Sequence, residues 1–515
     1  MAVERRPAAT SFMGLKACLP VFFTSVALIV LFVVATLGSG ADAAAGFKSI
    51  QDTIAENTGW FFILTANLVL GFAVYLLFSR FGSIRLGGDD ARPEFSTISW
   101  ITMLFSAGMG IGLVFWAVAE PLYHYAGPPV PPLDPDAKYL RAREAMGLTF
   151  LHWGLHPWAI YAVLGLGLAF ASFNKGLPLS IRSIFYPLLG DRIHGIAGHA
   201  IDTAAVLATL FGVATSLGLG VSQVNAGLDA SLSTGQSLSI KLWLIAGITA
   251  IATISVVTGV KKGIKFLSQL NMALAALLLL IVLVGGPTLL ILNGMVQNVG
   301  YYVQNFARLA TWGETYTDGH WQNSWTIFYY AWWISWAPFV GMFIARISRG
   351  RTVRTFICAV LVVPTLLGFF WLTAFGGTAL DLEMADVGGL MPALKEGVEN
   401  AFFALLQTLP AAEITIVLAT IVIVTFFVTS SDSGSLVIDM IAAGGDPDPP
   451  VQQRVFWAVT EGVVASVLLV GGGLVALRAA AITTGLPFAF VLLLVCFALL
   501  KWFREEAERT PRRRA

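Results

Sequence analysis

The chain has 515 residues, of which 57% are hydrophobic and only 12% are charged, and its mean hydropathy is +0.78. Soluble domains carry about twice this share of charge, so the composition excludes a soluble globular protein and indicates a membrane protein with many spans. The net charge of +1 gives no support for a nucleic-acid partner. Cys18, Cys358 and Cys496 stand alone in apolar segments and predict neither a disulfide nor a metal site.

Apolar windows of about 20 residues, the length that crosses a bilayer, recur along the whole chain. They predict an all-α membrane protein of twelve transmembrane helices, near residues 15–38, 59–79, 97–120, 146–171, 201–228, 240–258, 264–293, 322–346, 353–376, 413–442, 452–471 and 478–502.

The distribution of lysine and arginine predicts the orientation of these spans. With the N-terminus inside, 23 of the 31 basic residues fall in cytoplasmic segments and 8 fall outside. We therefore expect a multi-pass protein of the inner (plasma) membrane with both termini in the cytoplasm.

The third span contains Gly108, Gly110 and Gly112. Each glycine costs about 1 kcal/mol of helix propensity relative to alanine, and their alternate spacing does not give the stripe of small residues that packs helices together. An interrupted helix explains them better, since its freed amides can bind a carboxylate and its freed carbonyls a cation. Ordinary close packing is the alternative.

The fourth span carries Trp153, Trp158 and Tyr161, which fall within about a 140° arc of a continuous helix. His152 and His156 lie one turn apart in the same span. Because no third ligand or HExxH pattern is near them, we interpret them as hydrogen-bonding histidines, with a proton relay as the alternative.

Two further segments do not read as spans. Residues 294–314 have the pattern of an amphipathic helix on the outer face, and residues 381–410 mix acidic and apolar side chains as an outer helix or gate would.

The eighth span contains Trp332, Trp333 and Trp336, which share about a 100° arc of one helix. Tryptophan normally gathers at membrane interfaces, so three in mid-span indicate a cavity. Such a face suits a quaternary cation, which has no N–H to donate and is held by aromatic rings at roughly 0.5–2 kcal/mol each. A packed or lipid-facing aromatic stripe is the alternative.

The tenth span contains the polar run Thr429–Ser433, with Asp432 inside it. Hydroxyl and carbonyl oxygens suit a small monovalent cation, although serine and threonine in membrane helices also bond back to their own backbone. Intramembrane carboxylates tend to be functional. Asp432 therefore either acts directly or supports its neighbours as a hydrogen-bond acceptor.

Together these segments resemble the betaine/choline/carnitine transporter family over about residues 15–502, in Gly108–Pro121, Trp153–Tyr161, Trp332–Arg351 and Thr429–Ser433. The resemblance implies a LeuT-type core of two inverted five-helix repeats and a homotrimer. It divides the chain into two extra helices (1–96), a first repeat (97–293), an outer amphipathic helix (294–321), a second repeat (322–502) and a basic cytoplasmic tail (503–515).

The resemblance also implies site residues. Those matching the aromatic box and its pathway are Trp153, Trp158, Tyr161, Trp332, Trp333 and Trp336, with Gly108, Met109 and Gly110 facing the substrate. Those matching a sodium site are Ser106, Met109, Phe426, Thr429 and Ser430. A second sodium site is matched by Thr209 and Phe339, but Val213 stands where its other threonine is expected. Met272 stands where sodium-independent members carry an arginine, which favours ion coupling.

We therefore expect a sodium-coupled importer of a zwitterionic quaternary ammonium compound, with glycine betaine first and no cofactor besides the coupling ion. A proton-coupled choline importer and an importer of a methylated sulfonium zwitterion such as dimethylsulfoniopropionate are alternatives. A channel or a substrate sensor built on the same fold is an alternative from a different functional class. An intramembrane enzyme has little support, since Ser430, Ser431 and Ser433 have no histidine or lysine base nearby in sequence.

Overall fold

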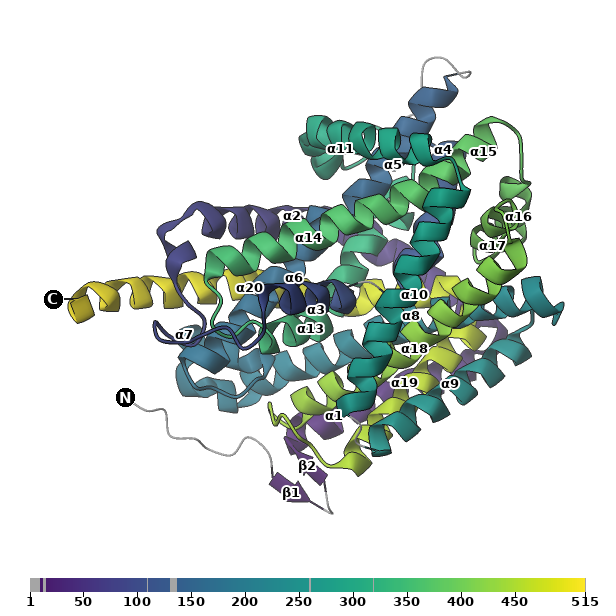
Figure 1. The fold of residues 1–515 in the computed structure, drawn as a ribbon. Helices are drawn as coiled ribbons and strands as arrows, with labels where there is room; N and C mark the ends of the chain where they lie inside the picture. The colour runs from purple at the N-terminus through teal and green to yellow at the C-terminus, as the bar shows by residue number, and fades with distance from the viewer. Residues whose placement is uncertain are drawn as a thin grey trace.

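The structure is a computed structural model that describes residues 10–12, 15–108, 110–129, 137–258, 261–317 and 319–514. Within these ranges the only strands form a short hairpin, β1 (Thr10–Phe12) and β2 (Leu15–Ala17), before the first long helix. All other regular elements are helical, which confirms the predicted all-α class (Figure 1).

The helices up to the middle of the chain are α1 (Leu19–Ser39), α2 (Ala43–Phe78), α3 (Thr97–Gly108), α4 (Ile111–Ala126), α5 (Lys138–Trp153), α6 (Leu155–Ala169), α7 (Tyr186–Leu189), α8 (Ile196–Leu232), α9 (Leu238–Thr258), α10 (Lys261–Gly285) and α11 (Thr288–Thr311). The later helices are α12 (Trp321–Ser324), α13 (Thr326–Arg346), α14 (Val353–Leu372), α15 (Thr378–Met384), α16 (Leu390–Glu396), α17 (Asn400–Gln407), α18 (Ala412–Ala442), α19 (Val451–Gly472) and α20 (Leu474–Arg514). Short 3-10 or π-helical turns occupy Gly40–Asp42, Arg80–Ser83, Phe170–Asn174, Ile181–Phe185, Gly190–His194 and Thr373–Gly377.

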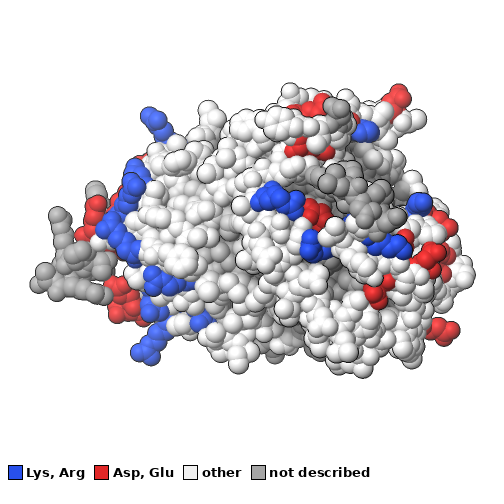
Figure 2. Space-filling view, turned by 90° about the horizontal axis from the view of Figure 1, so that it is seen from above, with Lys and Arg blue, Asp and Glu red and all other residues white. Residues whose placement is uncertain are grey.

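Nine helical stretches in the described residues are long and apolar enough to cross a membrane, and a tenth results if α10 and α11 count as one bent span. One of the nine, Leu19–Phe78, contains both of the first two predicted spans. Figure 2 shows charged side chains gathered toward two ends of the molecule, with a band between them that is almost free of charge. This pattern is that of a multi-pass membrane protein.

The structure breaks the third, fourth and seventh predicted spans, of which only the third was predicted to be interrupted. The third is interrupted as expected, because α3 ends at Gly108 and α4 begins at Ile111, with Gly110 extended at φ −140°. The fourth is not continuous: α5 ends at Trp153 and α6 begins at Leu155, so the single helix face predicted for its aromatic residues was wrong.

The seventh predicted span, 264–293, extends too far. Its helix α10 ends at Gly285, and the chain then bends by 109° into α11 (Figure 1). Pro287 directly precedes α11, and the residue before a proline is sterically disfavoured in a helix. Hydropathy alone could not show this turn, because apolar residues continue on both sides of it.

The centre of the molecule is α13, which is buried along almost its whole length and packs on α6, α8 and α20. Gly165 of α6 and Gly341 of α13 allow the two helices to approach closely. A Cβ atom on Gly165 would lie 2.6 Å from Ile344 Cγ1 and 3.0 Å from the carbonyl oxygen of Gly341. The two backbones are therefore in near contact at this crossing.

We expect Gly165→Ala to lower the thermal unfolding temperature of the purified protein. Overpacking typically destabilises by roughly 1–3 kcal/mol, more than the gain of about 1 kcal/mol in helix propensity. Gly247→Ala in α9 is the matched control, since its new methyl group would have no heavy atom within 4 Å. Scanning fluorimetry in detergent should show a fall for Gly165→Ala alone, and equal shifts in both variants would contradict the close crossing.

Candidate functional site

A pocket lies where helices from both halves of the chain meet, and it contains about 760 Å³ of space free of protein atoms, part of it open solvent. Its walls come from α4, α5, α6, α8, α10, α13 and α18. The lining residues are Gly110, Ile111, Gly112, Leu113, Trp153, Tyr161, Ser216, Asn271, Trp332, Trp333, Trp336, Phe339, Phe343, Phe426, Thr429, Ser430 and Ser433.

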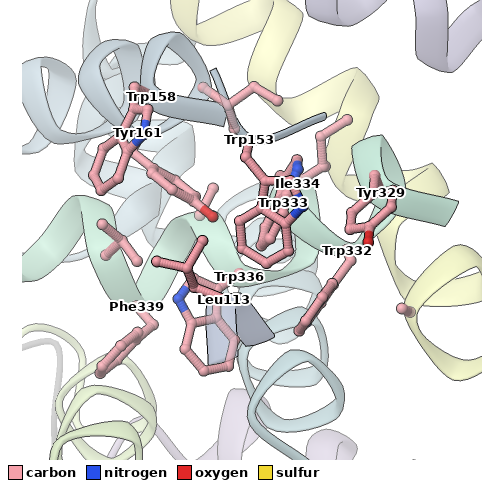
Figure 3. Close-up of a cluster of buried hydrophobic side chains, with 14 of the residues drawn as sticks. Leu113, Trp153, Trp158, Tyr161, Tyr329, Trp332, Trp333, Ile334, Trp336 and Phe339 are labelled. Carbon is pink, nitrogen blue, oxygen red and sulfur yellow. The ribbon is translucent and has the colours of Figure 1, made fainter. Parts of the chain in front are cut away.

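One wall of the pocket is aromatic (Figure 3). The rings of Trp332 and Trp333 stack with centroids 4.7 Å apart and an interplanar angle of 15°, and Trp153 meets Trp333 edge to face at 4.8 Å. The rings of Trp336 and Phe339 continue this wall, 5.1 Å apart. The wall presents ring faces and edges rather than charged groups, which suits a ligand held by dispersion and cation–π attraction.

Trp158 was predicted in the same box, but it does not line the pocket. It packs edge to face behind Tyr161, with centroids 5.6 Å apart, and Figure 3 shows it beside Tyr161 and away from Trp332. The break at Gly154 explains this arrangement, because Trp153 and Trp158 belong to two different helices. Trp158 therefore contacts the pocket only through Tyr161.

The interrupted helix also contributes backbone to the pocket. Gly110 lines it, and the first amides of a helix such as α4 have no carbonyl partner inside the helix. The amide of Leu113 is an exception, because it donates to the carbonyl of Gly110 at 3.2 Å. Met109 and the side chain of Ser106 lie outside the described residues, while Gly108 is the last residue of α3. The backbone amides at the N-terminus of α4 are therefore the described groups that could donate hydrogen bonds to an anion.

Gly112 fixes how closely α4 approaches the tryptophans. A Cβ atom there would lie 2.5 Å from Trp332 Cη2 and 3.3 Å from Trp153 Cη2. We expect Gly112→Ala to displace these rings and weaken binding of a quaternary ammonium ligand by roughly tenfold, the result of about 1.4 kcal/mol of lost contact. Tryptophan fluorescence titration measures this.

Gly110→Ala is the comparison, because its methyl group would meet no heavy atom within 4 Å and its φ of −140° suits any residue. Its effect on the same titration should be clearly smaller. Equal losses in the two variants would show that the contact with Trp332 is not the cause.

Hydroxyl and amide groups form the wall nearest α18. Thr429, Ser430 and Ser433 line the pocket with Asn271 of α10, whose Nδ2 donates to Thr429 Oγ1 at 2.9 Å. The Thr429 hydroxyl donates in turn to the carbonyls of Thr425 and Phe426, at 2.9 and 3.0 Å. Asn271 Oδ1 is buried without a hydrogen-bond partner among the described residues, so an unpaired acceptor lies on a residue of the pocket wall. Asn271 was not predicted, because its place in the pocket depends on Thr429 of another helix.

The remaining predicted residues lie in three places. Phe339 and Phe426 line the pocket, whereas Thr209 is buried in α8 and donates to its own backbone at Ala205 O, 2.7 Å away. The carboxylate of Asp432 does not line the pocket and accepts a hydrogen bond of 2.9 Å from Ser255 of α9. The structure therefore places Asp432 behind the hydroxyl run, in contact with a neighbouring helix.

The histidines hydrogen-bond as predicted. His156 Nε2 lies 3.3 Å from Asn67 Oδ1, and His152 Nδ1 lies 2.6 Å from a carboxylate oxygen of Glu120. His124 also contacts Glu120. The side chains of Glu120, His124 and His152 each place one possible ligand atom within 4.8 Å of the other two, a spacing that a metal ion also requires. Because these atoms are already hydrogen-bonded to one another, we interpret the group as a hydrogen-bond network.

Glu120 is the residue that sequence reasoning overlooked, although it stands inside the glycine-led motif. It is completely buried and hydrogen-bonded to Trp153 of the pocket. A lone carboxylate in an apolar run is costly in a membrane, and this signal was sufficient to mark it.

The whole chain is similar to known transporters. A family model described as "BCCT, betaine/carnitine/choline family transporter" matches residues 20–508. Glycine betaine transporter 1 of Vibrio parahaemolyticus is 48% identical, over 95% of this chain and 94% of its own length. The glycine betaine transporter OpuD of Bacillus subtilis is 44% identical, over 89% of each chain. An uncharacterized transporter of Mycobacterium tuberculosis is 50% identical, over 96% of this chain and 84% of its own length.

Proposed function

Because the chain belongs to the betaine/carnitine/choline family of transporters, we propose that it imports glycine betaine by sodium symport. Membership makes it a membrane transporter of small quaternary ammonium compounds rather than an enzyme. The observation that carries the choice of substrate is that one pocket is lined both by an aromatic wall and by the N-terminus of α4.

The two walls suit the two ends of a zwitterion. The trimethylammonium group lies against the rings of Trp153, Trp332 and Trp333, and the carboxylate meets the first amides of α4. Choline has no carboxylate and would leave these amides without a partner. It remains the second candidate, because one relative, 47% identical, is named a glycine betaine/proline/choline transporter.

Sodium is the proposed coupling ion, bound beside the substrate at Thr429 and Ser430. Both residues line the pocket, and the free oxygen of Asn271 adds a third hard ligand next to them. Backbone carbonyls of Ser106 and Met109 complete the proposed site. A second sodium at Thr209 and Phe339 has less support, since Thr209 does not line the pocket.

The proposal includes the twelve-helix LeuT-type arrangement with alternating access, homotrimeric assembly, and cytoplasmic termini in the plasma membrane. Its support is that segments 97–293 and 322–502 both contribute walls to one pocket, as expected when two repeats enclose a substrate between them.

Uptake of radiolabelled glycine betaine into proteoliposomes tests the proposal under an inward sodium gradient, an inward proton gradient, or neither. We expect accumulation only with sodium. Accumulation driven by protons alone would show that the proton and not sodium is the coupling ion. Stronger competition by choline than by unlabelled betaine would show that choline is the preferred substrate. No uptake under any gradient would reject the function.

A further inference from the structure

The carboxylate of Glu120 is completely buried and accepts hydrogen bonds at both oxygens. Oε1 lies 2.6 Å from His152 Nδ1 and 3.2 Å from His124 Nε2. Oε2 accepts from Trp153 Nε1 at 2.7 Å and from the hydroxyl of Tyr329 at 2.5 Å. The four partners come from α4, α5 and α13, so one side chain joins three helices beside the pocket.

The set of partners suits an ionised carboxyl group. An indole N–H can only donate, and an ionised carboxylate is acceptor-only with room for about four donors, which matches the four groups found here. No lysine or arginine of the described chain lies within ion-pair distance of Glu120, whose close ionic contacts are with His124 and His152. Arg478 interacts with Glu120 only from a greater distance. A negative charge is thus held by polar N–H and O–H groups immediately outside the aromatic wall.

Glu120 is connected by hydrogen bonds to Trp153 and Trp333 of the aromatic wall. It accepts the indole N–H of Trp153 directly. The indole of Trp333 donates to the backbone carbonyl of His152 at 2.8 Å, and the ring of His152 contacts Glu120. Since Trp153 and Trp333 meet edge to face at 4.8 Å, the same network sets their mutual angle as well (Figure 3).

We propose that Glu120 is a positioning residue for substrate binding, which holds Trp153 directly by its N–H and Trp333 indirectly through His152, and which places negative charge behind the box. This proposal rests on the proposed function. An N–H donated to a carboxylate leaves the indole richer in electron density, and a richer ring attracts a methylated ammonium group more strongly. The carboxylate itself touches no substrate, because the indole ring of Trp153 stands between them.

Glu120→Gln tests this role, since glutamine keeps the size of the side chain but replaces one acceptor oxygen with an NH2 group. That NH2 group faces donors, so Trp153 or His152 loses its partner. We expect the Kd for glycine betaine, measured by tryptophan fluorescence in saturating sodium, to rise roughly tenfold or more, as for a buried donor left unpaired. The KM of uptake should rise with it, and the maximal rate should change less.

A double-mutant cycle with Trp153→Phe separates positioning from a general structural effect. Phenylalanine keeps an aromatic ring in the wall but removes the N–H that Glu120 accepts. If Glu120 acts through this N–H, Glu120→Gln should weaken binding far less in the Trp153→Phe background than in the wild type. Additive losses in the cycle would overturn the proposal.

Glu144→Gln is the matched control, because it removes a hydrogen-bonded carboxylate that lies outside the pocket. Glu144 is held by Arg308 at 2.9 Å and by Tyr301, and it does not line the pocket, so the Kd should stay unchanged. If Glu120→Gln fails to fold, as judged by thermal unfolding, the cycle of Tyr329→Phe with Trp153→Phe takes its place and should again be non-additive.

The two possible failures are distinguishable. A wild-type protein that does not bind glycine betaine would reject the proposed function and this proposal together. A wild type that binds, with an unchanged Kd in Glu120→Gln, would overturn the role of Glu120 alone.

Discussion

Replacing Trp333 with alanine is expected to weaken glycine betaine binding by about a hundredfold, equivalent to ~2.7 kcal/mol. Trp333 is only 6% exposed, and its ring contacts both Trp332 and Trp153. Its loss removes one cation–π surface of up to about 2 kcal/mol and also frees two neighbouring rings that it holds in place. Fluorescence titration and the concentration dependence of uptake both report this loss.

Trp371→Ala in α14 is the control for the truncation itself. Trp371 is 3% exposed and its ring centroid lies 4.5 Å from that of Phe375, but it does not line the pocket. Both variants should lose stability, because removing a buried tryptophan commonly costs about 3–5 kcal/mol. Only Trp333→Ala should lose affinity per folded molecule, and an unaltered Kd in that variant would remove the aromatic box from the mechanism.

The double variant Thr429→Ala with Ser430→Ala should raise the sodium concentration for half-maximal uptake by at least about tenfold, a loss of ~1.4 kcal/mol or more in ion binding. Two hydroxyl ligands disappear, and Asn271 Nδ2 loses the Thr429 oxygen to which it donates. The measurement is initial uptake against sodium concentration at saturating betaine.

Thr420→Ala supplies the comparison on the same helix. Thr420 also bonds back to its own backbone, at Ile416 O, but it does not line the pocket. Its sodium dependence should match that of the wild type. If the double variant also kept the wild-type sodium dependence, the ion would have to bind elsewhere.

The sequence was sufficient for the fold class, because hydropathy over 20 residues measures directly what a membrane requires. It was also sufficient for the interruption between α3 and α4, since Gly108, Gly110 and Gly112 lower helix stability at the point where the break occurs. The breaks at Gly154 and Pro287 escaped prediction. Each lies inside a continuous apolar window, where hydropathy cannot distinguish a straight helix from two shorter ones.

Site residues could be predicted where the residue type is unusual for its position, but not where its role depends on tertiary contacts. The mid-span tryptophans Trp332, Trp333 and Trp336 predicted a cavity beside α13, and all three line the pocket. The place of Trp158 depended on the break at Gly154, which rotates α6 relative to α5. The contributions of Asn271 and Glu120 depend on partners from other helices. A local pattern could mark Glu120 as unusual in an apolar run, but it could not show which groups the carboxyl contacts.

The crossing of α6 and α13 at Gly165 and Gly341 has a consequence for ligand selection. Tyr161 lies one turn before Gly165 on α6, and Phe339 lies close to Gly341 on α13, so both walls are attached to the helices that meet there. Neither glycine lines the pocket, but a larger residue at either position would push the two helices apart. We expect such an exchange to change the width of the pocket and with it the headgroup diameters that the pocket accepts.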